Sequence, residues 1–139
     1  MEYPRDDLWE RKPYELLIAD GSLTTFFRPG DRVNQNNKKH FKKGETLTIR
    51  ILEKPGDEER GFVPIFNGHF RKARVVDIYK KNIENLTQED FEGGSPDVQN
   101  ILQLRYSLGV TYNKPIDSFK EVTTVKVKYL DKGFEDIVS

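Results

Sequence analysis

The sequence predicts one α+β domain, most simply a small β-barrel that is closed by the C-terminal strand and carries helices packed at one side. Three observations favour this fold. The chain has 139 residues, which suits one domain with a genuine hydrophobic core. Apolar residues alternate along several segments, as in half-buried strands. Two helix-start signals lie between the last two of these segments.

The predicted elements follow from hydrophobic periodicity and from the residues that begin and end each segment. The expected strands share alternation of apolar and polar residues and cover 23–27, 46–52, 62–66, 69–79 and 121–130. The expected helices begin at Pro13, Thr87 and Ser95. The remaining segments are polar or rich in Pro and Gly and form an irregular lead-in over 1–12, loops over 33–43 and 55–61, and a C-terminal tail over 131–139.

Asn67-Gly68 is the strongest turn signal in the chain. A primed two-residue turn needs positive φ at both central positions, and Asn and Gly tolerate that conformation best. We therefore expect residues 62–66 and 69–79 to pair as a β-hairpin.

Each of the last two predicted helices has a recognisable beginning. Thr87 can cap the first, with Asp90 in its first turn and an apolar staple between Leu86 and Phe91. The second is expected to start at Ser95-Pro96 and to end before Gly109.

Composition restricts the function classes. The chain contains 9 Phe, 6 Tyr and 1 Trp, which is too aromatic for a disordered protein, and it has no Cys. Thiol catalysis, disulfides and thiolate metal sites are therefore excluded. No stretch approaches the length of a membrane span, and the charged N-terminal residues do not resemble a signal peptide. We expect a cytoplasmic protein that has no membrane contact and is monomeric by default.

Charge is unevenly distributed although the net charge is zero. Residues 28–50 hold seven basic and two acidic side chains, and residues 69–81 hold five basic and one acidic. Residues 82–100 hold five acidic side chains and no basic one. Such blocks are often simply solvated faces, but they also allow a polarised surface that attracts phosphate groups.

Three segments carry a family resemblance. LLIADG, residues 16–21, is followed seven residues after its glycine by Arg28, and HFKKGE, residues 40–45, precedes a predicted strand. LTQEDF, residues 86–91, begins a helix that is followed by a second helix and a last strand. In this order they resemble ASCH domains, with their G-x-K-x-x-E-x-R and HFK-x-GD segments. The resemblance covers roughly residues 13–130.

The resemblance implies a PUA-like fold, a compact barrel with a cleft at its helical side, and binding of RNA or a nucleotide. Some ASCH proteins are amidohydrolases that act on acetylated cytidine, and ribonuclease activity is attributed to others. Here Leu23 and Phe26 stand where the signature has its lysine and its acidic residue. Leucine neither titrates nor donates a hydrogen bond, so hydrolysis of the family's kind is disfavoured.

We therefore predict a binding cleft and no catalytic residues, metal site or cofactor. Arg28 is expected to bind a phosphate or carboxylate in bidentate fashion, and not merely to cap a strand. The predicted ligand-binding residues combine cations with nearby hydrogen-bonding groups: Gly21, Ser22, Thr24, Arg28, Arg32, Lys39, His40, Lys42 and Arg71.

Two alternatives remain open at the level of sequence. One is a hydrolase, acting on a modified nucleoside or on RNA, with a rearranged site that combines Glu92 with Lys39 or His40. The other is a protein-interaction module whose cleft is plugged by Leu23 and Phe26. His40 and His69 lie on separate elements without a third ligand at a recognisable spacing, so a zinc site is not expected.

Overall fold

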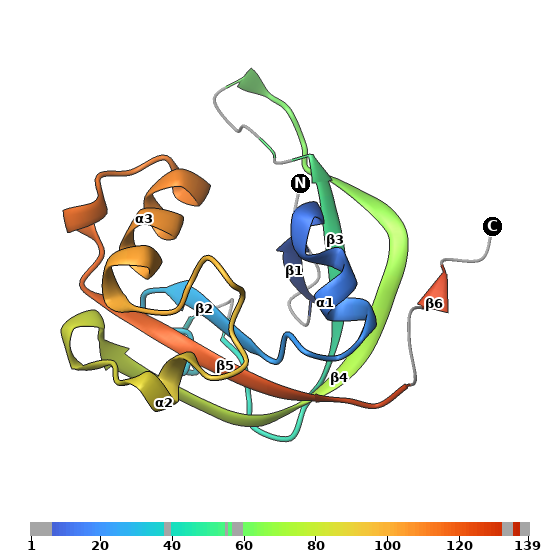
Figure 1. Cartoon of the computed structure of the whole chain (residues 1–139), viewed down its shortest axis with the longest axis horizontal. Coiled ribbons are helices and arrows are strands. Elements are labelled where there is room, and N and C mark those ends of the chain that lie inside the picture. The colour runs from blue at the N-terminus through green and yellow to red at the C-terminus, as the bar shows by residue number, and fades with distance from the viewer. Residues whose placement is uncertain (1–6, 38–39, 55, 57–59, 132–134, 137–139) are drawn as a thin grey trace.

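The structure is a computed structural model that describes residues 7–37, 40–54, 56, 60–131 and 135–136. In this part of the chain six strands form one strongly curved sheet in the order β1-β3-β4-β5-β2, with β6 paired to β4 (Figure 1). The strands are β1 (Asp7–Arg11), β2 (Thr25–Pro29), β3 (Thr46–Lys54), β4 (Ile65–Asn82), β5 (Glu121–Tyr129) and β6 (Glu135–Asp136).

Helices cover the sheet from two directions. The α-helices are α1 (Glu15–Ala19), α2 (Gln88–Phe91) and α3 (Ile101–Tyr112), and the 3-10 turns are η1 (Lys12–Tyr14), η3 (Ile83–Asn85) and η4 (Ile116–Ser118). Figure 1 shows α1 in the hollow of the sheet beside β1 and β3, and α2 with α3 on one side. The α+β class and the barrel-like curvature are thus confirmed. The predicted closure by the C-terminal strand is wrong, because β5 lies inside the sheet and β1 and β2 are its edges, and the helices do not all pack at one side. Among the described residues no helix is long and apolar enough to cross a membrane.

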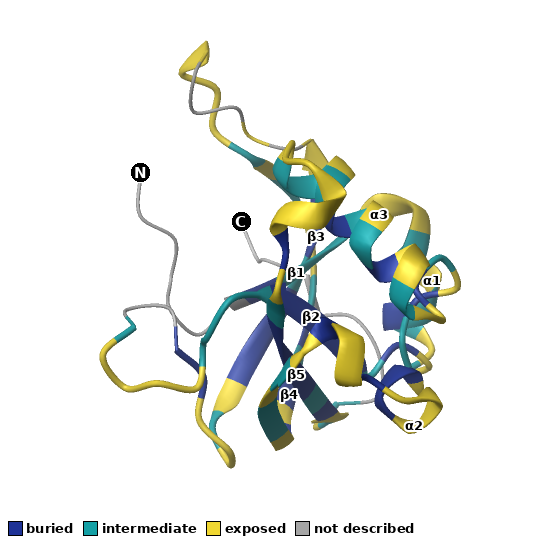
Figure 2. Ribbon diagram, turned by 90° about the vertical axis from the view of Figure 1, so that its left-hand side faces the viewer, coloured by how far each residue is buried: buried dark blue, intermediate teal, exposed yellow. Residues whose placement is uncertain are grey.

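Two hydrophobic clusters hold these layers together, and β2 contributes to both of them. Because successive side chains of a strand point to opposite faces, Phe26 packs with Leu8, Ile18 and Ile49 inside the curl of the sheet. Phe27 faces the other way and packs with Phe91 and residues of α3. Buried residues accordingly follow the strands in Figure 2. The sheet therefore has a core on each side of β2.

The lead-in is not irregular throughout, because residues 7–11 form β1. This strand pairs in parallel with β3, and Trp9 lies opposite Arg50. Leu8 is buried in the main core. Pairing with a distant strand gives this short, charged segment its extended conformation. The predicted tail also contains the short strand β6, which pairs with β4.

The predicted hairpin at Asn67-Gly68 is wrong, because both residues lie inside the continuous strand β4. In the register between β3 and β4, Arg50 lies opposite Phe70 and Leu52 lies opposite Phe66. The two extra residues of β4 form a bulge instead of a turn, and φ at Gly68 is not positive. The connection between β3 and β4 falls at residues 55–64, part of which lies outside the described residues.

The first helix-start signal is confirmed, and the second is displaced. Thr87 and Asp90 form a capping box at the start of α2. α3 begins after Asn100, whose side-chain oxygen accepts a hydrogen bond from the Gln103 backbone N–H, so Ser95 is not its cap. Gly109 lies within α3, which ends at Asn113 in the left-handed conformation, at φ 53°.

Candidate functional site

The barrel is open between β1 and β2, the two edges of the main sheet, and the Arg28 side chain bridges this opening. Its Nη1 donates to the Phe27 carbonyl at 2.8 Å, and its Nη2 donates to the Trp9 carbonyl at 2.6 Å. The guanidinium also lies over the Trp9 ring, 5.0 Å from its centroid. Arg28 is only 8% exposed. We call the region where Arg28 joins the two strand edges the seam.

Arg32 places a second cation at the seam. It follows β2, and its backbone N–H donates to the Thr123 hydroxyl on β5 at 2.8 Å. Burial of its side chain and the positive charge of Arg28 both lower the pKa of Arg32, while the nearby Tyr112 phenol opposes that change. Within the described part of the chain neither arginine has a carboxylate at ion-pair distance. As far as the described residues go, the seam therefore holds two neighbouring cations without a carboxylate at ion-pair distance.

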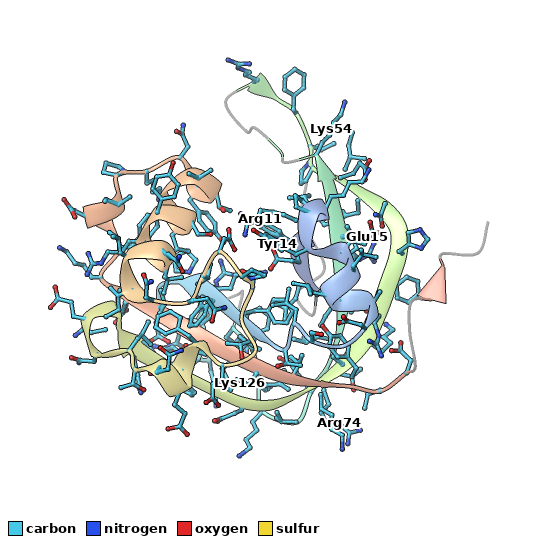
Figure 3. The ribbon with its side chains drawn as sticks, in the orientation of Figure 1. Arg11, Tyr14, Glu15, Lys54, Arg74 and Lys126 are labelled. Carbon is cyan, nitrogen blue, oxygen red and sulfur yellow. The ribbon has the colours of Figure 1, made fainter. Side chains whose placement is uncertain are left out.

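A third arginine at the seam, Arg11 on β1, is paired. Its guanidinium contacts the carboxylate of Asp97 at 2.8 Å and that of Glu10 at 3.3 Å, and it lies over the Tyr14 ring. Figure 3 shows Arg11 and Tyr14 side by side between α1 and the segment before α3. Burial opposes ionisation of Asp97, but hydrogen bonds from Ser95 and Arg11 outweigh it and lower the pKa. Arg11 thus supplies little free positive charge.

A small cavity and a larger groove meet at the seam. The cavity, of about 50 Å³, is lined by Arg28 and by residues of β1, β2, α3 and the segment before α3. The groove, of about 730 Å³, runs from Trp9 past β3 to the β3–β4 connection and is mainly apolar. Both hollows are lined by Trp9, Arg11, Thr111 and Tyr112. The two hollows therefore share a wall, so a charged group in the cavity and an aromatic group in the groove would lie next to each other.

The structure brings Arg28 and Arg32 together, but it places Gly21 and Arg71 at the other end of the barrel. Arg28 lies opposite Thr123 of β5, whereas the Arg71 guanidinium lies over the ring of Tyr129 on the same strand. Six residues of strand separate these positions by about 20 Å. Gly21 ends the helical turn of α1 with φ +80° and lies beside Arg71. These two predicted site residues therefore do not share the seam.

The remaining predicted residues have mainly local roles. Ser22 is exposed and bonds to Asp20 through its backbone N–H and its hydroxyl. The Thr24 backbone N–H donates to the Gly93 carbonyl at 2.8 Å. His40 is buried in its loop, where its Nδ1 lies 2.7 Å from the Asn37 carbonyl, and Lys42 is exposed. Lys39 lies outside the described residues.

Leu23 and Phe26, the departures from the family signature, are both core residues. Leu23 is 1% exposed and Phe26 is 2% exposed, and both pack inside the curl of the sheet. Phe26 also lines the small cavity. Their apolar character thus serves packing at positions where a lysine and an acid would be costly to bury.

The sequence alone did not reveal several residues of the seam, namely Trp9, Arg11, Asp97 and Tyr112. Trp9 and Arg11 lie in the segment expected to be irregular, and Tyr112 lies beyond the glycine expected to end the helix. The usable signal was the concentration of charge around the chain's single Trp, in DLWERK. No local pattern, however, joins that segment to Arg28.

Comparisons with known proteins support the fold. No protein-family model and no curated protein sequence matches the chain. Among solved structures it is similar to the crystal structure of protein EF3133 from Enterococcus faecalis V583, of the family DUF984, with a TM-score of 0.55. The two chains are 10% identical, and the match covers 91% of this chain and 74% of the other. At that identity the likeness shows a shared fold alone.

Proposed function

We propose that this protein binds a nucleotide or a short RNA at the seam without catalysing a reaction, with a phosphate on Arg28 in the cavity and a base in the groove. Arg32 does not line the cavity itself, but it interacts with Arg28 and with Tyr112, which does, and would add positive charge from behind that wall. The observation that carries the proposal is the pair of neighbouring arginines, Arg28 buried and Arg32 half-buried, with no carboxylate at ion-pair distance among the described residues. Burial and mutual repulsion both disfavour such a pair. A bound anion would offset both costs.

Guanidinium groups suit phosphate recognition because their N–H donors form a planar fork. Carbonyl groups of Phe27 and Trp9 fix the Arg28 side chain, and Arg28 has five N–H donors in total, so donors remain after these two bonds. The carbonyl bonds also hold the guanidinium in one orientation before a ligand arrives. A preorganised cation loses less side-chain entropy on binding than a flexible surface lysine.

The groove suits a base. Its volume, about 730 Å³, lies in the usual range for small-molecule sites, and it is lined by the aromatic rings of Trp9, Phe62, Phe66 and Tyr112. Aromatic side chains bind bases by stacking with little sequence preference. A nucleotide with its phosphate in the cavity would place its base against these rings.

The chemistry of the seam favours binding over hydrolysis. Among the described residues, the seam carboxylates Glu10 and Asp97 both form ion pairs with Arg11. Hydrogen bonds from Ser95 and Arg11 lower the pKa of Asp97, which makes it a poor general base. Glu92, the acid considered for a rearranged hydrolase, is exposed, and its backbone carbonyl accepts a hydrogen bond from the Thr25 hydroxyl. The ASCH resemblance and its PUA-like fold remain part of this proposal, resting on the three segments that carry them.

The experiment uses the single tryptophan, Trp9, because it lies in the proposed site. Tryptophan fluorescence is recorded while adenosine 5′-monophosphate, or a short single-stranded RNA, is added at low and at moderate salt. We expect saturable quenching that weakens with salt, since phosphate contacts release counterions.

Arg32→Ala is the informative variant, and Arg74→Ala is its control. Arg74 is exposed on β4, has no carboxylate at ion-pair distance in the described structure, and lies away from Arg11 and Tyr14 (Figure 3). Both variants lose one positive charge, but only Arg32→Ala should weaken binding by about tenfold or more. Equal affinities of wild type and Arg32→Ala, or no binding at low salt, would contradict the proposed function and favour a protein-interaction module.

A further inference from the structure

We propose, on the basis of the function inferred above, that the seam selects a terminal phosphate monoester over an internal phosphodiester. The chemical class is thus the phosphorylated end of a nucleotide or of an RNA chain. This selectivity follows from the charge of the seam, from the size of its cavity and from the groups around it.

Charge favours the monoester. Among the described residues, Arg28 and Arg32 have no carboxylate at ion-pair distance, whereas Arg11 is occupied by Glu10 and Asp97. Arg28 lines the cavity, and Arg32 interacts with Arg28 and with the cavity residue Tyr112. A phosphate monoester carries a charge of about −1.5 to −2 at neutral pH, while a diester carries a single negative charge. The monoester carries enough negative charge to balance two neighbouring guanidiniums, whereas the diester balances only one of them.

The size of the cavity also favours the phosphate monoester. The cavity of about 50 Å³ exceeds the space that one water needs, but it is far smaller than a nucleotide. Leu104 and Leu108 of α3 and Val98 line it together with Arg28, so buried apolar side chains form part of its wall. A terminal phosphate can enter with its chain leaving toward the groove. For an internal phosphate, the cavity would also have to accommodate the second ester-linked nucleoside.

The polar lining can satisfy the oxygens of a terminal phosphate. Ser107 and Thr111 contribute hydroxyl groups from α3 and Tyr112 contributes a phenol, all from half-buried residues that line the cavity. A monoester presents three strong acceptor oxygens, and a diester presents two. Hydroxyl donors near two guanidiniums therefore favour the group with more acceptors.

The test compares ligands that differ only in phosphate substitution. Trp9 fluorescence is titrated with adenosine 5′-monophosphate, adenosine 3′-monophosphate, adenosine 3′,5′-cyclic monophosphate and adenosine. A second pair, a tetranucleotide RNA with a 5′-phosphate and the same RNA with a 5′-hydroxyl, separates an RNA end from a free nucleotide as the source of the group.

We expect at least one monoester to bind about tenfold more tightly than the cyclic diester, and adenosine to bind weakest. Arg32→Ala should reduce the preference to about threefold or less, while Arg74→Ala should leave it unchanged. A cyclic diester that binds as tightly as both monoesters would overturn the selectivity while leaving nucleotide binding standing. Failure of every nucleotide and RNA to bind would overturn both proposals.

Discussion

Arg28 and Arg71 are buried to nearly the same extent, yet they have opposite electrostatic surroundings. Both are less than a tenth exposed, lie over an aromatic ring and donate to backbone carbonyls. Arg71 also forms an ion pair with Asp131 at 2.7 Å. Arg28 has another cation, Arg32, as its charged neighbour.

The difference separates a structural role from a binding role. Arg71 joins the end of α1 to the residues that follow β5, because it donates to the Ile18 and Asp131 carbonyls as well as to the Asp131 carboxylate. The positive charge of Arg71 is balanced by the Asp131 carboxylate. The charge of Arg28 is held in position but has no carboxylate at ion-pair distance in the described part of the chain, which suits a ligand.

The largest expected effect is the loss of stability in Arg71→Ala. Removing the cation leaves Asp131, whose side chain is 19% exposed, without its ion-pair partner and with the Lys72 backbone N–H as a remaining donor, so we expect the free energy of unfolding to fall by about 3 kcal/mol. Urea denaturation measures this change. Arg74→Ala, from the exposed side of the same strand, should change it by no more than about 0.5 kcal/mol. Similar losses in both variants would remove the structural role that we assign to Arg71.

A buried carboxylate, Asp90, extends the comparison to the opposite charge. It accepts hydrogen bonds from the Thr87 backbone N–H and the Tyr79 hydroxyl, and it pairs with Lys81. Burial opposes its ionisation, but these partners outweigh burial and lower the pKa of Asp90 to about 2. Like Arg71, it is fully compensated, so we expect it to stabilise the fold.

The expected effect of Asp90→Asn is a loss of about 2 kcal/mol at neutral pH. Because the folded pKa is below the unfolded one, the stabilisation is present above about pH 4 and disappears as the pH falls toward 2. Urea denaturation at several pH values should therefore show a wild-type advantage that shrinks with acid. Glu89→Gln, at an exposed residue of α2, is the control and should show no such advantage. If the difference in the free energy of unfolding between wild type and Asp90→Asn stayed the same at every pH, the ionised carboxylate would not be the source of the stabilisation.

The sequence predicted elements that depend on local patterns. The strand at 121–130, the helix opened by Pro13 and the capping box at Thr87 were all found, because alternation, proline and caps act within a few residues. The hairpin at Asn67-Gly68 failed because pairing with β3 absorbed those residues as a bulge. Tertiary pairing overrode the local turn preference.

The candidate site was predictable only in part for the same reason. Arg28 and Arg32 lie close in sequence, so their basic character was visible at once. Trp9 reaches Arg28 through the opening between two sheet edges, and Tyr112 comes from the far end of α3. Such contacts depend on the topology of the whole sheet, to which no short motif points.

A smaller loss of stability is expected for Arg28→Lys, which keeps the positive charge but loses the planar fork of guanidinium N–H donors. A lysine ammonium lacks the planar fork of N–H donors that bonds the Phe27 and Trp9 carbonyls, so we expect the free energy of unfolding to fall by about 1 kcal/mol. Nucleotide affinity should fall by about tenfold, because the cation is no longer held in one orientation. Urea denaturation and Trp9 fluorescence measure the two changes. Wild-type affinity in this variant would mean that charge alone, and not the fixed guanidinium, binds the phosphate.

The smallest expected effect on stability belongs to Phe62→Ser, at the groove end of the proposed site. Phe62 is 62% exposed and lines the groove, so its loss should change the free energy of unfolding by no more than about 0.5 kcal/mol. If a base stacks there, nucleotide affinity should fall about fivefold while the affinity for inorganic phosphate stays constant. Leu102→Ser, at an exposed apolar residue of α3 that does not line the groove, is the matched control and should leave both affinities unchanged. Equal nucleotide affinity in the two variants would place the base elsewhere and confine the recognition of the ligand to the charged end, at Arg28 and Arg32.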